Sequence, residues 1–391
     1  MTSATEVQGI CDSRFEPVKE AFLANFADHG EVGAAVAVMV EGKMVVDLWA
    51  GHADADRTRL WHRDTIVNLY STTKGMTTVC AHRLADQGLL DLDAPVAKYW
   101  PEFAQGGKED IPVRYLLSHQ AGLPALREIL PRGALYNWDV MTSALAAEQP
   151  WWEPGTRHGY HALTFGFLVG EIIRRVTSMS VGRYFQQEIA APLGLDFHIG
   201  LAPEHEVRVA DMVPSPFPEL DADNPLAKVF ADPESMSFKA FVMTADLLGD
   251  PLYMNKRPWR AAEIPAANGH GNARALARIY GALAIGGALD GVRVLSAQAI
   301  ERATQEQCHG EDAVMVGFPS RFALGFALPV PETRIARGER VFGHGGMGGS
   351  QAFADPDAGL GFAYTMNKML FSTDPIDPRH PPLINAVYDC L

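Results

Sequence analysis

The pattern of apolar and polar positions predicts a helix and then two strands near the start of the chain. Residues 13–28 place their apolar side chains on one helical face. Residues 32–40 and 43–49 are two apolar, strand-like runs separated by Glu41 and Gly42, which is typical of an antiparallel hairpin. This order differs from the alternating strands and helices of a doubly wound fold.

The middle and the end of the chain differ in pattern. Helical spacing predicts helices over 162–176 and 272–286, and most of the chain up to about residue 260 is expected to be helix and loop. Residues 203–268 are rich in proline and weakly periodic, which predicts a long irregular cap region of a kind that often carries function. Strands are predicted at about 322–328, 340–345, 349–354 and 359–366, before a final helix that starts near Pro382.

Residues 66–88 combine a strand-like run with a helix and contain the first candidate chemistry. The apolar run ends at Ser71, and helical spacing continues to Gly88, which is expected to end the helix. Ser71 would therefore lie among unpaired N–H groups at the helix N-terminus, with Lys74 on the same face. A serine hydroxyl needs a nearby base to act as a nucleophile, and a partly buried lysine of lowered pKa can serve. Taken alone, this spacing is more often an ordinary serine N-cap beside a solvated lysine.

Composition and charge narrow the function classes. With 391 residues, 47% of them hydrophobic and 20% charged, the chain is predicted to be globular with two structural units. A formal net charge of −14 argues against a nucleic-acid partner, because phosphate binding needs clustered Lys and Arg. No stretch is apolar enough to span a membrane, and residues 1–8 lack the pattern of a signal peptide, so we expect a cytoplasmic protein with no membrane partner.

Spacing disfavours several other kinds of site. The four cysteines are widely scattered, which predicts reduced thiols, and no histidine has a carboxylate at metal-site spacing, so neither a metal nor another cofactor is expected. Residues 343–348 fit G-x-G-x-x-G, but a strand is expected to follow them instead of the helix of a dinucleotide site. Residues 348–352 nearly fit G-x-S-x-G, but too few residues follow for an α/β-hydrolase fold.

Three further features could complete a nucleophilic site with Ser71. Tyr160 precedes a predicted helix, and a tyrosine near cations would have a lowered pKa and could act as a general base, although a half-buried structural tyrosine is the more common role. His344-Gly345-Gly346 lies between strands, where glycines let a ligand or another backbone approach closely. The backbone N–H groups of Ser71 and Met347 are candidates for an oxyanion hole.

In this order and spacing, the motifs resemble the serine β-lactamase and penicillin-binding-protein superfamily, and most of all the family VIII carboxylesterases, the esterase branch related to class C β-lactamases. The resemblance covers roughly residues 15–370. It rests on Ser71-x-x-Lys74, Gly-Leu-Leu-Asp-Leu-Asp-x-Pro-Val at 88–96, Val-Arg-Tyr-Leu-Leu-Ser-His-x-x-Gly-Leu-Pro at 113–124, Pro154-Gly155 leading to Tyr160, His344-Gly345-Gly346, and the strand that ends at Asn367-Lys368. Each motif is weak singly, but the ordered set is specific.

The pattern and the resemblance together predict an α+β fold of the β-lactamase/transpeptidase type. An antiparallel sheet flanked by helices is expected from residues 1–75 and 266–391, with a mostly helical domain inserted at 76–265. The site would lie between these two parts, where Ser71, Tyr160 and His344 converge from distant segments.

The resemblance implies hydrolysis of short-chain carboxylic esters through an acyl-enzyme on Ser71, with Lys74 and Tyr160 sharing the role of general base. It further implies substrate contacts from His344, Gly345 and Gly346 on the glycine-rich strand. Separately, Trp152 is one of several large apolar residues that could line an acyl or alcohol pocket, although packing in the core or cap is at least as common a role for such residues. The activity is expected to rise with pH through neutrality as the Lys74–Tyr160 pair loses a proton. His344 would add a second limb near its usual pKa of about 6.5 if it is exposed.

Two departures from the family pattern favour an ester over a β-lactam. Where the family has Tyr-x-Asn, this chain has Tyr160-His161-Ala162, so the amide is missing. Where the family has Lys-Thr-Gly, His344 replaces the cation that would meet a β-lactam carboxylate. A β-lactamase or D-alanyl-D-alanine peptidase is still the main alternative, and a non-catalytic binding protein on this scaffold is the alternative from another class. The expected partner is a small-molecule ester, and the chain is expected to be a monomer or a small homo-oligomer.

Overall fold

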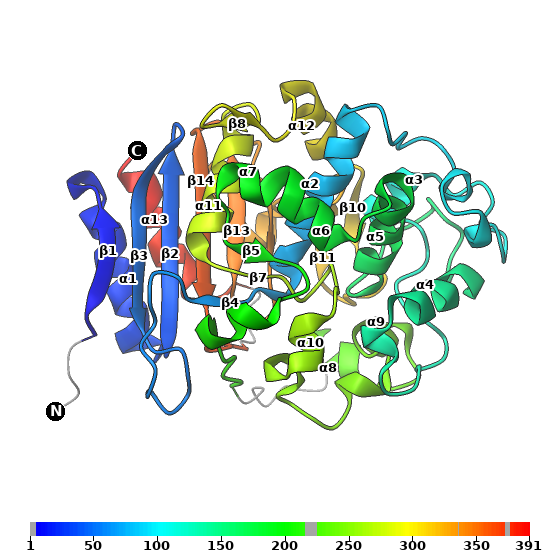
Figure 1. The fold of residues 1–391 in the computed structure, drawn as a ribbon, viewed down its shortest axis with the longest axis horizontal. Coiled ribbons are helices and arrows are strands. Elements are labelled where there is room, and N and C mark those ends of the chain that lie inside the picture. Colours follow the sequence, from blue (N-terminus) through cyan, green and yellow to red (C-terminus); the bar gives the residue numbers. More distant parts are fainter. Residues whose placement is uncertain (1–4, 216–224, 335, 372–375) are drawn as a thin grey trace.

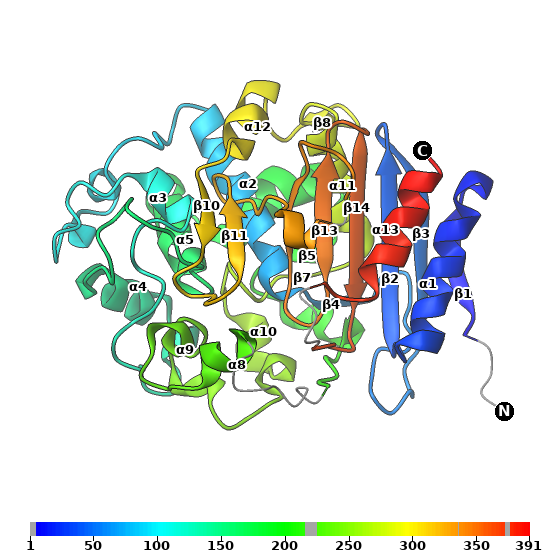
Figure 2. The same cartoon turned by 180° about the vertical axis from the view of Figure 1, so that it is seen from behind.

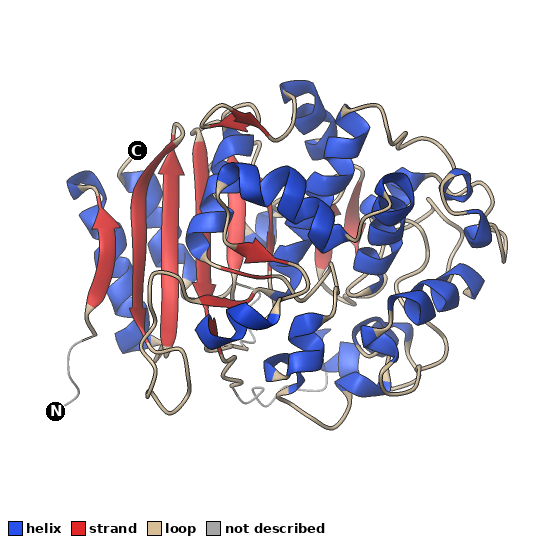
Figure 3. Ribbon diagram, in the orientation of Figure 1, coloured by secondary structure: helices blue, strands red, loops and turns tan. Residues whose placement is uncertain are grey.

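A six-stranded antiparallel sheet forms one half of the molecule (Figures 1 and 3). A computed structural model describes residues 5–215, 225–334, 336–371 and 376–391. Neighbouring strands of this sheet are all antiparallel, and the N-terminal strands join the C-terminal ones where Val36 lies opposite Tyr364. The predicted antiparallel sheet is therefore confirmed. Its strands are, in order, β1 (Val7–Cys11), β3 (Lys43–Gly51), β2 (Gly33–Val40), β14 (Leu360–Met366), β13 (Gln351–Asp355) and β12 (Phe342–Gly345).

Helices flank this sheet, as predicted, and they cover both of its faces. α1 (Glu16–Asp28) and α13 (His380–Asp389) lie side by side on one face, and α11 (Ala273–Ala284) lies on the other (Figures 1 and 2). The side chains of β2 and β14 are buried along almost the whole length of both strands, because both faces of the sheet are covered. α11 can approach β14 closely because Gly361 has no side chain. A Cβ at this position would lie only 2.3 Å from the backbone nitrogen of Gly281.

The helical part of the chain lies beyond the β12 edge of the sheet (Figure 1). At its centre α2 (Thr73–Asp86) packs against α5 (Thr164–Thr177) and β12, and is buried on nearly every side. The assignment of residues 76–265 to a separate domain stays a prediction. The remaining described α-helices and hairpins are α3 (Val113–Leu117), α4 (Trp138–Ala147), α6 (Val181–Phe185), α7 (Ala191–Leu193), α8 (Pro225–Phe230), α9 (Met236–Phe241), α10 (Arg257–Ala261), α12 (Ala297–Thr304), β10 (Cys308–Glu311) with β11 (Pro319–Phe322), and β8 (Ala288–Leu289) with β9 (Val292–Arg293), of which β8 contacts α11.

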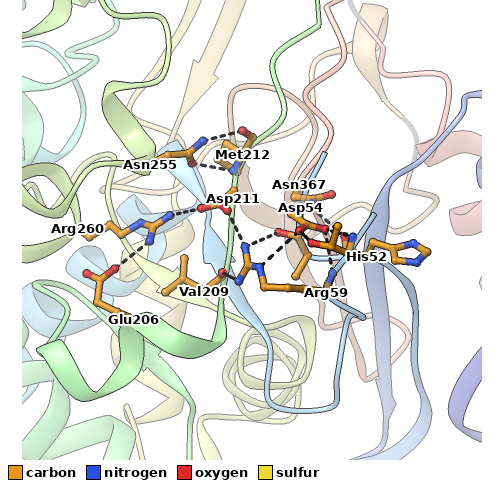
Figure 4. Close-up of polar contacts among 12 residues, drawn as sticks. His52, Asp54, Arg59, Glu206, Val209, Asp211, Met212, Asn255, Arg260 and Asn367 are labelled. Carbon is orange, nitrogen blue, oxygen red and sulfur yellow. Dashed lines mark hydrogen bonds and ion pairs between the residues drawn. The ribbon is translucent and has the colours of Figure 1, made fainter. Parts of the chain in front are cut away.

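A second, small sheet leads the chain into α2. β4 (Ile66–Asn68) lies between β7 (His270–Gly271), which pairs on its other side with β5 (Phe197–His198), and β6 (Val209–Ala210). Hydrogen bonds from residues outside the small sheet hold β6 in place (Figure 4). Arg59 donates to the carbonyl of Val209 at 3.1 Å and to Asp211 at 2.6 Å, and the largely buried Arg260 donates to Asp211 at 2.7 Å. These charge-assisted bonds hold the strand beside β4 and so stabilise the segment that precedes Ser71.

The structure differs from the pattern, or adds to it, in three places. The strand predicted at 322–328 is wrong: β11 ends at Phe322, and the chain reverses in a tight turn in which Gly325 has a φ of +94°. β1 was not predicted, because it is a mostly exposed edge strand without an apolar face. The expected cap region proves to contain the short helices α8, α9 and α10, and its residues 216–224 lie outside the described residues. Among the described helices, none combines the length and apolarity needed to cross a bilayer.

Candidate active site

Ser71 lies on a sharp strand-to-helix connection. β4 ends at Asn68, residues 70–72 form a single 3₁₀ turn, and α2 begins at Thr73. Tyr70 has a φ of +44°, in the left-handed region that bulky residues rarely adopt, and such strain costs about 1–3 kcal/mol. The turn therefore presents Ser71 at the N-terminus of α2, where the sequence predicted it.

The side chains of Lys74 and Tyr160 both reach the Ser71 hydroxyl. Lys74 Nζ lies 3.1 Å from Ser71 Oγ, and Tyr160 Oη lies 2.8 Å from the same oxygen. Lys74 Nζ also donates to the backbone carbonyls of Ala162, at 2.7 Å, and Ala266, at 3.0 Å. Ser71 and Tyr160 thus converge from distant segments, as predicted, and their side chains lie within hydrogen-bond reach of each other.

Burial determines the protonation of Lys74. The side chain is fully buried, and this lowers the pKa of Lys74 well below its ordinary value, because the ammonium loses its hydration. A neutral amine has two N–H donors and one lone pair. A neutral Lys74 that donates both N–H groups to the carbonyls of Ala162 and Ala266 would present its lone pair to the Ser71 hydroxyl, 3.1 Å away.

Tyr160 does not have the lowered pKa that its position near cations suggested. Burial raises the pKa of Tyr160, the hydrogen bond with Ser71 lowers it to a lesser degree, and the nearby charge of Asp312 raises it. The phenol therefore keeps its proton around neutrality and donates it to Ser71 Oγ. The expectation was wrong because desolvation of the phenolate outweighs the attraction of any neighbouring cation.

His344 lies on β12, with its ring centroid 6.0 Å from that of Tyr160. Only 7% of the residue is exposed, and burial, followed by the charge of Lys74, lowers the pKa of His344 to about 3. Its Nδ1 lies 2.7 Å from the carbonyl oxygen of Gly345, which can only accept, so this nitrogen carries the proton of a neutral imidazole. The activity limb expected near pH 6.5 is therefore excluded, because it required an exposed His344.

The turn after β12 is fastened to the segment that carries Ser71. Gly346 donates its N–H to the carbonyl of Ser350 at 2.7 Å. The Ser350 hydroxyl donates to the carbonyl of Leu69 at 2.9 Å and lies 3.0 Å from the hydroxyl of Thr72. Met347 lies at the tip of this turn. The two candidate oxyanion donors, at Ser71 and Met347, thus belong to two segments that are bonded to each other, and their joint role stays a prediction.

A cavity of about 580 Å³ opens beside these residues, within the usual size of small-molecule sites. Asp377, which pairs with Arg379 at 2.6 Å, is the one charged residue among those that line it in the described part of the chain. The predicted site residues in its wall are Ser71, Tyr160, His344, Gly345, Gly346 and Met347, and the apolar wall includes Val229, Phe230, Phe241, Met315, Leu328 and Phe371.

Trp152 was expected to contact substrate, and this expectation needs correction. Its ring is buried and packs edge-to-face on His161, with centroids 6.0 Å apart. The residue is not among those lining the cavity in the described chain. A large aromatic side chain is more often buried in the protein interior than placed in a binding site, and Trp152 follows this general tendency.

Several residues at the site carry no local sequence signal. Asp312 and Ser350 are buried and accept the backbone N–H groups of Tyr160 and Gly346, respectively, yet Asp312 is 152 positions from Tyr160. Ser350 had drawn attention only as the serine of the rejected G-x-S-x-G match at 348–352 and by its place in the glycine-rich stretch 343–350. The described residues contain no group of three or more His, Cys, Asp or Glu side chains that could hold a metal ion.

Known proteins resemble this chain over nearly its whole length. The Beta-lactamase family model matches residues 18–383. The esterase/beta-lactamase LipL of Mycobacterium tuberculosis is 38% identical over 371 residues, which cover 93% of this chain and 83% of LipL. A crystal structure of a family VIII carboxylesterase is 44% identical, covers 99% of this chain and 100% of that one, and has a TM-score of 0.88. A penicillin-binding protein homologue from Caulobacter crescentus is 39% identical, with the same coverage and a TM-score of 0.86. This chain therefore belongs to the Beta-lactamase family.

Proposed function

We propose that this hydrolase of the serine β-lactamase-like family is a carboxylesterase that cleaves short-chain esters through an acyl-enzyme on Ser71. The observation that carries the proposal is the placement of Lys74 Nζ and Tyr160 Oη at 3.1 and 2.8 Å from Ser71 Oγ, at the wall of a largely apolar cavity. A nucleophile needs a base within this reach, and an uncharged ester suits a wall of this kind.

In the proposed acylation, neutral Lys74 takes the proton of Ser71 as its Oγ attacks the ester carbonyl carbon. The N–H groups of Ser71 and Met347 bind the oxyanion that forms. When this intermediate collapses, the alkoxide leaves with the proton of the Tyr160 phenol, and the Lys74 ammonium returns a proton to the phenolate. The raised pKa of Tyr160 and the lowered pKa of Lys74 favour this division of roles, with the lysine as base and the tyrosine as acid.

Deacylation follows the same groups in reverse. A water molecule attacks the acyl carbonyl while the Lys74–Tyr160 pair accepts one of its protons, and collapse returns a proton to Ser71 Oγ as the carboxylic acid leaves. Each cycle therefore consumes one ester and one water and releases one alcohol and one acid.

The main competing activity is hydrolysis of a β-lactam or of a D-alanyl-D-alanine peptide. Such substrates carry a carboxylate, and His344 stands uncharged where the family's lysine would meet it. Among the described residues that line the cavity, none is a lysine or an arginine. We therefore expect p-nitrophenyl butyrate to be turned over with a kcat/KM at least about 100-fold above that of nitrocefin, since a missing charge partner costs several kcal/mol.

The test of the proposal is the Ser71→Ala variant together with active-site labelling. Removal of the nucleophile should lower kcat on p-nitrophenyl butyrate by about three orders of magnitude or more, because a catalytic unit fails when one member is lost. A fluorophosphonate should label the parent at Ser71 and leave the variant unlabelled. Undiminished turnover by Ser71→Ala would refute the mechanism, and absence of both turnover and labelling in the parent would favour a non-catalytic binding protein.

A further inference from the structure

We propose that Asp312 is a positioning residue for Tyr160, and that it couples the placement of this acid to one wall of the substrate cavity. The inference rests on the proposed function, because it assigns a supporting role to a residue outside the reacting group. Asp312 does not touch Ser71 or Lys74 and follows β10 in the chain. The residue is nevertheless only 4% exposed, and its carboxylate faces the segment that carries Tyr160.

One oxygen of this carboxylate gathers three backbone donors. Asp312 Oδ1 accepts the N–H groups of Tyr160, Val314 and Met315, each at 2.9 Å. The other oxygen, Oδ2, accepts the hydroxyl proton of Ser320 at 2.7 Å. Such bonds to an ionised acceptor are stronger than neutral ones and hold their donors in a defined geometry.

The bond to Tyr160 acts on the part of the residue that aims its side chain. The Tyr160 ring stacks on Phe322, with centroids 6.1 Å apart and planes 10° apart, and its hydroxyl is 2.8 Å from Ser71 Oγ. The ring contact fixes the plane of the phenol, whereas the bond from Asp312 fixes the backbone atom from which the side chain extends. The position of the hydroxyl depends on both.

The other two donors extend the effect to the cavity. Met315 lines the cavity, and Val314 is fully buried in a small apolar cluster with Ala240 of α9. Tyr160 packs against the same cluster. One carboxylate thus holds together the acid, a side chain of the cavity wall and the residue on which a cap helix rests.

Removal of the carboxylate should therefore impair the chemical step. In Asp312→Ala the three N–H groups lose their common acceptor, and the Tyr160 hydroxyl loses its fixed distance from Ser71. A displacement of this kind near 1 Å lowers rates by up to about 100-fold. We expect kcat on p-nitrophenyl butyrate to fall by about 10- to 100-fold, while KM changes by less than about threefold. Asp312→Asn keeps an acceptor oxygen in the same place and should recover most of the lost kcat.

Asp246 provides a matched control. It is 5% exposed, accepts the N–H groups of Gly133 at 2.8 Å and Leu135 at 3.3 Å, and accepts the hydroxyl of Thr244 at 3.1 Å. It therefore resembles Asp312 in burial and bonding, but it holds a loop that contains no site residue. Asp246→Ala should lower Tm, as Asp312→Ala does, and leave the kcat of the folded protein within about twofold of the parent.

The set of variants separates the possible results. Parental kcat in folded Asp312→Ala, an equal loss of kcat in Asp246→Ala, or an Asp312→Asn variant as slow as Asp312→Ala would each overturn the positioning role. If Asp312→Ala does not fold, Asp312→Ser carries the same test, since its shorter hydroxyl cannot serve all three donors. Ser71→Ala measured alongside distinguishes the two proposals: if it stays active the proposed function fails, and if it is inactive while Asp312→Ala is parental only the role of Asp312 fails.

Discussion

Gly346 is the point where the turn after β12 comes closest to the segment that carries the nucleophile. A Cβ at this position would lie 2.3 Å from the carbonyl oxygen of Leu69 and 2.2 Å from the hydroxyl oxygen of Ser350. Both atoms belong to the hydrogen bond that joins the turn to that segment. The Gly346→Ala variant should therefore push the two segments apart.

The size of this effect follows from the distances. Real Cβ atoms essentially never approach another heavy atom closer than 3.0 Å, so the contact with Leu69 requires a shift of at least about 0.7 Å. The N–H of Met347, on the same turn, would move away from Ser71 by a similar distance. A misplacement near 1 Å, or the loss of one oxyanion donor, lowers kcat by about 100-fold, which is about 2.7 kcal/mol of transition-state stabilisation. We expect a 10- to 100-fold lower kcat with a smaller change in KM.

The assay is steady-state hydrolysis of p-nitrophenyl butyrate, with Tm measured on the same samples. Gly361→Ala is the control, because its Cβ would lie 2.3 Å from the nitrogen of Gly281 and 2.6 Å from the carbonyl oxygen of Ala277. The steric conflict is similar, but it lies between β14 and α11, and it should lower Tm with little change in kcat. Parental kcat in folded Gly346→Ala, or an equal loss in Gly361→Ala, would show that the turn does not have to stay in register with Ser71.

Three further predictions concern charge and pH. The Tm of Lys74→Met minus the Tm of the parent should be larger at pH 7 than at pH 9.5. A lysine whose pKa is lowered in the folded state binds more protons when unfolded, so the stability of the parent rises with pH towards 10.5, whereas methionine does not titrate. A Tm difference that does not change with pH would contradict the lowered pKa. His344→Gln should keep the shape of the kcat/KM profile between pH 5 and 9, since the imidazole titrates only near pH 3, and loss of an acid limb would refute this. Arg379→Met should lower the free energy of unfolding, measured in urea, by about 3–5 kcal/mol, because it leaves the buried carboxylate of Glu31 without its ion-pair partner. A loss below about 1 kcal/mol would argue against a charged pair.

Local regularities explain what could be predicted. The spacing of Ser71 and Lys74 places both on the first turn of a helix whatever the rest of the chain does, and Gly88, with a φ of +72°, ends that helix as its pattern indicated. Apart from the exposed edge strand β1, the strands of the sheet were found from their apolar runs, because a strand covered on both faces is apolar throughout. The turn at 323–327 was missed because its residues are as apolar as those of a strand, and the reversal is seen only in the structure, where Gly325 has a φ of +94° and packs closely on Thr78.

The amino-acid sequence by itself was enough to select Ser71 and Lys74 as candidates on one helix turn, to place the sheet strands other than β1, and to indicate the family to which these motifs belong. The tertiary structure decided the directions in which the pKa values of Lys74, Tyr160 and His344 shift, since these depend on burial by segments far away in the chain. It also decided that Trp152 packs away from the cavity and that Asp312 supports Tyr160 from 152 residues away. Desolvation and long-range hydrogen bonds arise only when the chain is packed, so no local pattern of residues encodes them.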